Sequence, residues 1–242
     1  MKSWFLKIFH SLTDFVFPRR CVVCQHVLSE TEQFVCNGCY VNLPFVPDFG
    51  KPGNPIEKLF WSYHIVRAGS MLVFQSGNAT QQIVHTIKYH NHPDAGIFFG
   101  RIMAQRLEGE DFFNGIDAIL PLPLSETRLR SRGYNQSEML AQGISDVTGQ
   151  PVLADAVKRV IDNPTQTHLS SIQRRDNVRD IFEVTHPEQL TGRHLLLVDD
   201  VITTGASLRS LLESLSQYPD IHCSILSLSV AGKHHAIPTK EE

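Results

Sequence analysis

Residues 195–207, with the sequence LLLVDDVITTGAS, decide the fold of this 242-residue chain. The run LLLV is apolar and too short for a helix of its own, which is typical of a buried strand. The acidic pair Asp199 and Asp200 follows it, and a loop containing Gly205 then leads into a helix expected over 206–215. The order of strand, acidic pair, loop and helix predicts an α/β unit in which a strand end opens onto a helix amino terminus.

The loop after the acidic pair has the composition of a phosphate site. Thr203, Thr204 and Ser207 supply hydroxyl groups, and Gly205 tolerates positive φ. Ala206 is the first residue of the expected helix. Together with the helix dipole, these groups predict binding of a phosphate monoester. Two carboxylates beside a phosphate would repel it unless they faced hydrogen-bond donors, and vicinal ribose hydroxyls are suitable donors. The segment therefore predicts a ribose 5-phosphate ligand. The glycine motifs of dinucleotide-binding folds and of Walker loops are absent.

The sequence around this unit alternates between strand and helix patterns. Strands are expected over 116–122, near Val152, over 195–198 and over 221–230, and an alternating apolar pattern occupies 59–66. Helices are expected over 80–89, 96–107, 135–148 and 206–215. This alternation predicts a mostly parallel, doubly wound sheet. Cys223 falls in an apolar run and is expected to be part of the core.

Four of the five cysteines form two close pairs near the amino terminus. Cys21 and Cys24 make one Cys-x-x-Cys, Cys36 and Cys39 make another, and eleven residues separate the pairs. Four thiolates at this spacing can form a closed tetrahedron around Zn²⁺, so we expect a structural zinc ion that does no chemistry. Two disulfides are the alternative, and they would need an oxidising compartment.

Composition limits the remaining possibilities. The chain is 42% hydrophobic and 19% charged, with a net charge of −3, so it is expected to be globular without a general attraction for nucleic acid. No apolar run is long enough to span a membrane, and residues 1–17 resemble an amphipathic helix more than a secretory signal. We expect a cytoplasmic protein with an amino-terminal helix and zinc module over 1–43, a proline- and glycine-rich linker over 44–55, and an α/β domain over 56–242.

Several motifs together resemble one known family. The 195–207 segment is similar to the phosphoribosyl pyrophosphate (PRPP) signature of phosphoribosyltransferases. CVVC at 21–24, CNGC at 36–39, PLPL at 121–124, RGYNQSEMLA at 132–141 and QTHLSSIQRRDNVRDIF at 166–182 resemble the ComF/ComFC family, which is associated with competence and the use of external DNA. The resemblance implies a type I phosphoribosyltransferase fold with a zinc module. It also implies that Asp199 and Asp200 hold the ribose hydroxyls of PRPP while residues 203–207 hold its 5-phosphate.

PRPP also carries a diphosphate, which requires a second anion site and Mg²⁺. The candidate loop contains Leu122, Pro123 and Leu124, although a proline-rich strand exit would look the same. Arg128, Arg130 and Arg132 alternate before Gly133 and could form a cationic flap, or a solvated basic surface. Arg174 matches the family pattern and belongs to a basic set with Arg175 and Arg179. This set could bind diphosphate, an acidic partner or single-stranded DNA, or it could form ion pairs with neighbouring acidic residues.

Three functions remain open from the sequence. The chain could transfer phosphoribosyl groups to an unknown acceptor, displacing diphosphate at C1 with a nitrogen nucleophile. It could instead be a PRPP-responsive regulator without turnover. It could also be a DNA-uptake factor that binds single-stranded DNA or competence proteins, such as a helicase or membrane component. Arg19, Arg20, Phe34 and Tyr40 give the zinc module a few groups suited to nucleic acid.

Overall fold

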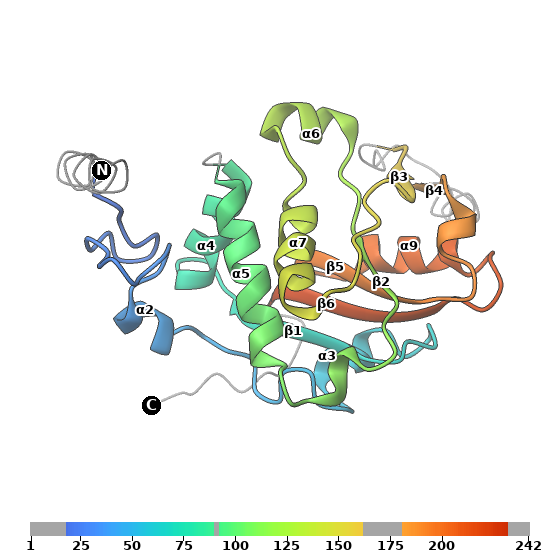
Figure 1. The fold of residues 1–242 in the computed structure, drawn as a ribbon, viewed down its shortest axis with the longest axis horizontal. Coiled ribbons are helices and arrows are strands. Elements are labelled where there is room, and N and C mark those ends of the chain that lie inside the picture. Colours follow the sequence, from blue (N-terminus) through green and yellow to red (C-terminus); the bar gives the residue numbers. More distant parts are fainter. Residues whose placement is uncertain (1–17, 90–91, 162–180, 232–242) are drawn as a thin grey trace, which may run out of the picture.

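Four parallel strands form the central sheet (Figure 1). Their order across the sheet is β1 (Ala68–Phe74), β6 (His222–Ala231), β5 (His194–Ile202) and β2 (Ala118–Pro121). Every neighbouring pair runs in the same direction, so the carboxyl ends of all four strands lie along one edge. The structure is a computed structural model that describes residues 18–89, 92–161 and 181–231.

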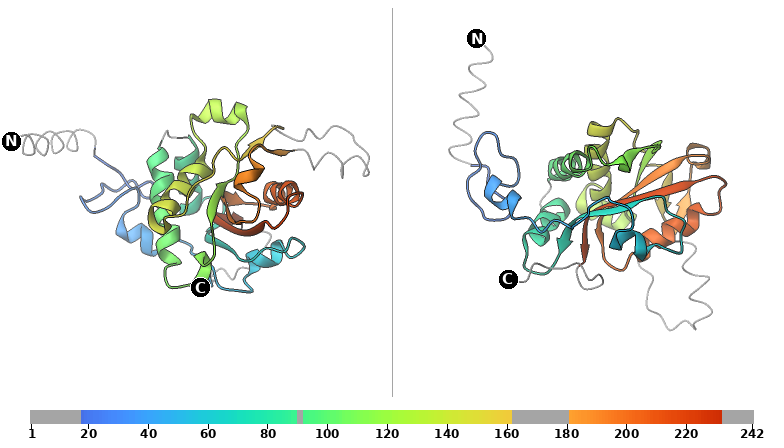
Figure 2. Two further views of the ribbon diagram at one scale, coloured as in Figure 1. Left: turned by 45° about the vertical axis from the view of Figure 1, so that its right-hand side comes forward. Right: turned by 90° about the horizontal axis from the view of Figure 1, so that it is seen from below.

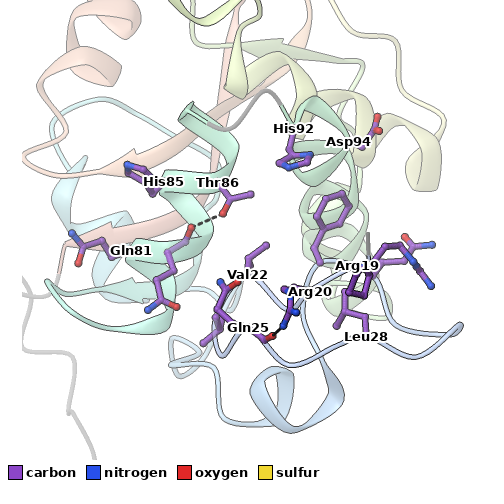
Figure 3. A pocket seen from close by; sticks show the side chains of 15 residues that line it. Arg19, Arg20, Val22, Gln25, Leu28, Gln81, His85, Thr86, His92 and Asp94 are labelled. Atoms are coloured by element: carbon purple, nitrogen blue, oxygen red, sulfur yellow. Dashed lines mark hydrogen bonds between the residues drawn. The ribbon is translucent and has the colours of Figure 1, made fainter. Parts of the chain in front are cut away.

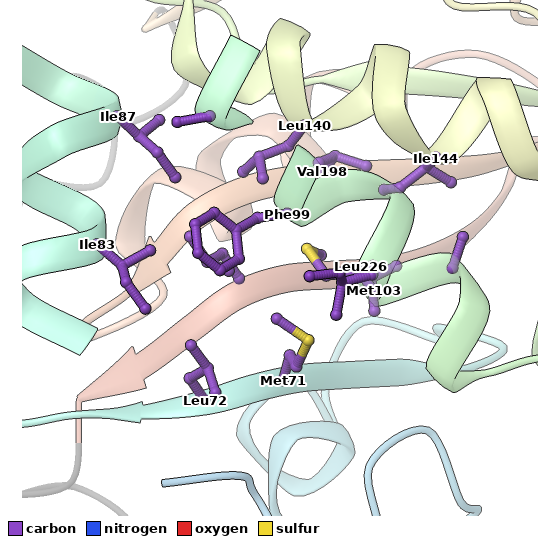
Figure 4. Packing of buried hydrophobic residues seen from close by; sticks show 14 of the residues in the cluster. Met71, Leu72, Ile83, Ile87, Phe99, Met103, Leu140, Ile144, Val198 and Leu226 are labelled. Atoms are coloured by element: carbon purple, nitrogen blue, oxygen red, sulfur yellow. The ribbon is translucent and has the colours of Figure 1, made fainter. Parts of the chain in front are cut away.

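Helices cover both faces of the sheet (Figures 1 and 2). On one face lie α4 (Ala79–Tyr89), α5 (Pro93–Arg106) and α7 (Gln136–Thr148), and on the other lie α3 (Pro55–Leu59) and α9 (Ala206–Leu215). The side chains of β5 alternate accordingly: Leu196 and Val198 join the first core, and Leu195 and Leu197 join the second. Figure 4 shows the first core, in which Met71, Phe99 and Leu226 fill the space between sheet and helices. Because both faces are covered, the strands are mostly apolar, and the polar residues within them, such as Ser70, Ser227 and Asp199, are buried.

The remaining elements are short. They are α2 (Asn37–Val41), α6 (Glu126–Arg132), the antiparallel pair β3 (Val157–Arg159) and β4 (Phe182–Val184), and the 3-10 turns Asp111–Phe113 and Pro187–Gln189. The predicted class, α/β with a parallel sheet and a small four-cysteine module, is confirmed. The helices expected over 80–89, 96–107, 135–148 and 206–215 are present with small shifts at their ends.

The structure corrects three sequence predictions. The first strand begins at Ala68, after the alternating segment 59–66, which starts at the last residue of α3 and continues as turns and irregular chain with Trp61 83% exposed. The expected strand near Val152 is reduced to a single parallel bridge with Ile119. The strand expected over 195–198 extends to Ile202, so the acidic pair is part of β5. Cys223 is buried in β6, as predicted.

The four-cysteine module lies beside α4 and α5, with α2 at its end (Figure 1). Phe34 of the module contacts Phe98 of α5, with ring centroids 5.5 Å apart. The chain then returns to the sheet, where Val46 N–H donates to the Met71 carbonyl at 2.9 Å and Phe45 forms a bridge with Leu72. Within the described residues, no helix has both the length and the apolar character that crossing a membrane requires.

Helices α5 and α7 cross at unusually close range because glycines meet at the crossing. A Cβ atom on Gly100 would overlap the Leu140 carbonyl oxygen, and one on Gly143 would overlap the Ile97 carbonyl oxygen. Because backbone lies against backbone here, the rotation of a side chain cannot make room for an added methyl group. The close crossing fixes α7, whose amino terminus reaches the carboxyl edge of the sheet.

We expect Gly143→Ala to lower the free energy of unfolding by about 1–3 kcal/mol, because the added methyl group forces two backbones apart. Chemical denaturation measures the change. Gly38→Ala is the matched control, since Gly38 lies in a helix with no atom within 4 Å of the added carbon. Equal stability of Gly143→Ala and the wild type would contradict the close crossing.

Candidate functional site

A cavity of about 290 Å³ opens at the carboxyl edge of the sheet. Three strand ends reach it: Phe74 of β1, the segment after β2, and Asp199 and Asp200 of β5. Helix α4, the start of α7, helix α6 and the loop into α9 complete the wall. Its other lining residues are Val84, Lys88, Leu122, Pro123, Leu124, Arg128, Arg132, Gln136, Ser137, Arg159, Val201, Thr203 and Ser207. Nine candidate positions from the sequence therefore meet in one cavity: Leu122, Pro123, Leu124, Arg128, Arg132, Asp199, Asp200, Thr203 and Ser207.

The acidic pair is buried and already has partners. Asp199 is 8% exposed and Asp200 is 5% exposed. Asp199 Oδ1 accepts hydrogen bonds from the Ser137 hydroxyl at 3.3 Å and from the Asp200 backbone N–H at 2.8 Å. Asp200 Oδ2 lies 2.6 Å from the Lys88 ammonium. The two carboxyls are thus held on the cavity wall by α7 and α4.

Burial raises the pKa of Asp199 well above its ordinary value of 3.8, and the negative charge of Asp200 raises it further. The Lys88 ammonium acts in the opposite direction without reversing the shift. Two adjacent buried carboxylates would repel each other, and a proton on Asp199 relieves that repulsion. The pair therefore offers both a hydrogen-bond acceptor and, at Asp199, a carboxyl that holds its proton more tightly.

The loop from β5 to α9 lies beside the acidic pair. Gly205 has φ +76° and is the residue at which α9 begins, with no side chain capping the helix. Thr204 Oγ1 accepts a weak bond from Ala206 N–H at 3.3 Å, whereas Thr203 and Ser207 line the cavity. The uncapped amino terminus of a ten-residue helix leaves backbone N–H groups available for an anion.

The opposite wall follows β2. Leu122 N–H donates to the Val198 carbonyl at 2.8 Å, which ties this segment to β5. Asn135 then holds the same residue, because its side-chain amide donates to the Leu122 carbonyl at 3.1 Å while its oxygen accepts from Ser137 N–H at 3.1 Å. Tyr134 donates its hydroxyl proton to the Ile87 carbonyl of α4 at 2.5 Å. The 132–137 motif thus connects α4, α7 and the 122–124 segment.

The predicted arginines separate into two groups. Residues 126–132 form helix α6, in which positions four apart share a face, so Arg128 and Arg132 both line the cavity. Arg130 lies on another face of α6 and pairs with Glu126 at 3.0 Å on an exposed surface. Arg132 also donates to Gln136 at 2.7 Å. Arg174 lies outside the described residues.

Sequence reasoning did not identify three contributors to this site: Lys88, Ser137 and Arg159. Ser137 falls within the RGYNQS motif, and its place at the start of a predicted helix was the available signal. Lys88 follows the apolar residues of the helix expected over 80–89 and looked like an ordinary basic residue at a helix end. Only the approach of α4 to β5 in three dimensions brings it to Asp200.

Magnesium, which the family resemblance implies, does not fit the acidic pair as it is built. Mg²⁺ prefers several oxygen ligands in octahedral geometry. At this site Asp200 Oδ2 contacts an ammonium group, and Asp199 Oδ1 accepts two hydrogen bonds. A divalent ion on these atoms would have to displace Lys88, so we assign no magnesium to the acidic pair.

A separate cluster contains the four amino-terminal cysteines. The sulfur atoms of Cys21, Cys24, Cys36 and Cys39 all lie within 4.8 Å of one another, and all four residues are free thiols rather than disulfides. Burial raises the pKa of Cys21, but backbone hydrogen bonds from Cys24, Cys36 and Val23 outweigh it and lower the pKa to about 7. Burial and the neighbouring thiols raise the pKa of Cys39. A backbone hydrogen bond at Cys39 lowers the pKa of Cys36, but burial and the neighbouring thiols outweigh it and raise that pKa. The clustering of four sulfur atoms is the donor arrangement of a structural zinc site, so these residues could hold a zinc ion.

A larger cavity, of about 1060 Å³, lies between the module and helix α4 (Figure 3). Arg19, Arg20 and Phe34 line it from the module, and His85 and His92 line it from the other side. Arg20 donates to the Gln25 carbonyl at 3.0 Å, and Arg19 donates to the carbonyls of Glu32 and Ser29. The cavity thus combines cationic and aromatic groups at the junction of two parts of the chain.

Known proteins resemble this chain over different spans. It is 27% identical to competence protein F of Haemophilus influenzae over 214 residues, which cover 82% of this chain and 91% of that protein. It is 30% identical to DNA utilization protein YhgH of Salmonella typhi over 136 residues, 55% of this chain and 59% of the relative. It is 31% identical to competence protein ComFC of Bacillus subtilis over 99 residues, 39% and 38% of the two chains. These relatives support the ComF/ComFC family.

Solved structures resemble the chain more weakly. A glutamine PRPP amidotransferase from B. subtilis, complexed with ADP and GMP, is 18% identical, with 60% of this chain and 30% of that chain covered and a TM-score of 0.42. An adenine phosphoribosyltransferase from Leishmania donovani is 13% identical, with 81% and 88% covered and a TM-score of 0.37. No family model matches the chain.

Purified protein should contain about one zinc ion per chain, and Cys39→Ser should lose it, because three thiolates and a hydroxyl bind zinc poorly. Metal analysis and a thermal melt with and without chelator test this. Cys223→Ala is the control, since Cys223 lies in β6 away from the cluster. Full zinc content in Cys39→Ser would exclude the four-cysteine site.

Proposed function

We propose that this chain, a relative of the competence and DNA utilization proteins, binds PRPP in the cavity at the carboxyl edge of the sheet. The observation that carries the proposal is the convergence there of the buried acidic pair, the loop before α9 and the segment after β2. A ribose with a 5-phosphate and a C1 diphosphate needs a hydroxyl acceptor and two anion sites, and these three features supply one candidate for each within a single cavity.

Each part of PRPP has a candidate partner. Asp199 and Asp200 would accept hydrogen bonds from the ribose hydroxyls. The uncapped amino terminus of α9, with Thr203 and Ser207, would hold the 5-phosphate. Arg128, Arg132 and the 122–124 segment would face the diphosphate, where guanidinium groups form paired hydrogen bonds with phosphate oxygens.

The reaction class that this arrangement serves is phosphoribosyl transfer. A nitrogen nucleophile would form a bond to C1 while the bond from C1 to diphosphate oxygen breaks. The electron pair leaves with diphosphate, and the nitrogen releases its proton to solvent. The arginines neutralise the leaving group, and the acidic pair fixes the sugar without acting as a nucleophile, so positioning and electrostatics supply the acceleration. We place this activity in the cytoplasm, where the thiols of the module stay reduced.

PRPP should raise the Tm of the protein by roughly 5–10 °C when its concentration is about 100 times Kd. Asp199→Asn combined with Asp200→Asn should abolish that shift, because each amide puts an NH₂ donor in place of a carboxyl oxygen and the charge that pairs with Lys88 is lost. Differential scanning fluorimetry in the presence of Mg²⁺ gives the measurement.

The matched control is Glu108→Gln combined with Glu110→Gln, which removes two exposed carboxylates far from the cavity and should leave the shift intact. An unchanged shift in the Asp199 and Asp200 variant would remove the acidic pair from the site. Release of diphosphate from labelled PRPP, dependent on one added base or amine, would separate a transferase from a regulator that only binds.

The larger cavity favours a second function, binding of single-stranded nucleic acid. Arg19 and Arg20 supply positive charge in a space of about 1060 Å³, and Phe34 and His92, whose ring centroids lie 6.3 Å apart, line the same space. Base stacking on aromatic side chains combined with cationic contacts to phosphates is the usual mode of binding single strands. The printed names of the relatives, which refer to competence and DNA utilization, agree with this role.

Single-stranded oligonucleotide should bind with an affinity that falls as salt rises, and Arg20→Glu with Phe34→Ala should weaken it about 10-fold or more through lost phosphate and stacking contacts. Fluorescence anisotropy over a salt series measures both effects. Zinc content must match the wild type, which shows that the module is still folded. Absence of binding at low salt would reject this second function.

A further inference from the structure

Lys88 is the unexplained charged group of the cavity. It lies in the last turn of α4, its side chain is 20% exposed, and its ammonium is 2.6 Å from Asp200 Oδ2. A buried carboxylate oxygen requires compensation, and no hydrogen-bond donor among the described residues satisfies this atom apart from the ion-pair contact. The ammonium therefore stabilises the charge of Asp200 at the position where the sugar would bind.

The position of Lys88 is fixed by its neighbours rather than by Asp200 alone. Ile83, Val84 and Ile87 anchor α4 in the core beside β1. The preceding residue, Ile87, has its carbonyl bonded to the Tyr134 hydroxyl at 2.5 Å, which connects this turn to the start of α7. A lysine whose backbone is held in this way, and whose ammonium already contacts Asp200, presents its charge to the cavity before a ligand binds.

We propose that Lys88 is the resident cation of the sugar site and takes the place of a divalent metal beside the ribose hydroxyls. The inference rests on the proposed binding of a phosphorylated ribose. An ammonium has three N–H donors and Asp200 Oδ2 engages one of them, so the others can reach the hydroxyl oxygens of the sugar. Asp200 would accept the hydroxyl protons while Lys88 donates to the same oxygens. A divalent ion would have to expel Lys88 to reach these atoms.

The consequence is that binding of the sugar does not depend on a metal. Ribose 5-phosphate is the suitable probe, because it has the hydroxyls and the 5-phosphate but lacks the diphosphate that itself binds Mg²⁺. For the wild type, Kd should differ by less than about 3-fold between EDTA and millimolar Mg²⁺, since the cation required by Asp200 is part of the chain.

Lys88→Met should weaken binding of ribose 5-phosphate in EDTA by about 10-fold or more, and Mg²⁺ should recover part of the loss because the site then lacks its own cation. Lys88→Arg keeps the charge and should remain insensitive to the metal. Lys58→Met removes a lysine from an exposed position on α3 and is the matched control. Isothermal titration calorimetry gives the affinity of each of the four proteins in EDTA and in Mg²⁺, and a thermal melt of each variant establishes that it is folded.

The outcomes separate the two proposals. Wild-type binding of ribose 5-phosphate that requires Mg²⁺ would overturn the role of Lys88 and leave the proposed function standing. If Lys88→Met binds ribose 5-phosphate as tightly as the wild type and is equally insensitive to Mg²⁺, the role of Lys88 is likewise overturned and the proposed function stands. Failure of the wild type to bind ribose 5-phosphate or PRPP in either condition would overturn both. If Lys88→Met does not fold, the wild type and Lys88→Arg still decide the question through their response to Mg²⁺.

Discussion

The structure depends on keeping two adjacent carboxylates buried at the end of a central strand. Asp199 and Asp200 follow an apolar run that must lie inside the sheet, so the chain cannot turn them toward solvent without withdrawing β5 from the core. Uncompensated burial of such a pair would cost several kcal/mol. The Ser137 hydroxyl, the Asp200 backbone N–H and the Lys88 ammonium reduce that cost. The hydroxyl and the ammonium come from helices α7 and α4, which pack on the sheet, and the N–H belongs to β5 itself.

The motif RGYNQS at 132–137 illustrates how one short segment can organise such a site. Gly133 ends α6 in a left-handed conformation, Asn135 caps α7, and Ser137 reaches Asp199. Tyr134 fixes the end of α4, which carries Lys88. The motif is therefore mainly a junction between three helices and two strand ends. The segment predicted as a cationic flap is the preceding helix α6, from which Arg128 and Arg132 face the cavity.

The parts of the site that could be predicted from sequence are those encoded by neighbouring residues. The strand, the acidic pair and the helix start lie within thirteen consecutive positions. The spacing of the two Cys-x-x-Cys pairs can likewise be read directly from the sequence. Lys88 could not be predicted, because its partner is more than a hundred residues away and only the packing of α4 sets the distance. Arg128 and Arg130 show the intermediate case: their alternation was visible, but which one faces the cavity depended on whether the segment was helical.

Helix α4 forms a partition with a different cavity on each side. Its Gln82, His85 and Thr86 line the larger space beside the module, while Val84 and Lys88 line the smaller one beside the acidic pair. A ligand that tilted or stiffened this helix from one side would change the position of Lys88 on the other. By thermodynamic reciprocity, if the first ligand changes the affinity for the second by some factor, the second changes the affinity for the first by the same factor. One three-turn helix thus lies against both cavities, so that occupancy of the one beside the acidic pair would be linked to occupancy of the one beside the amino-terminal module.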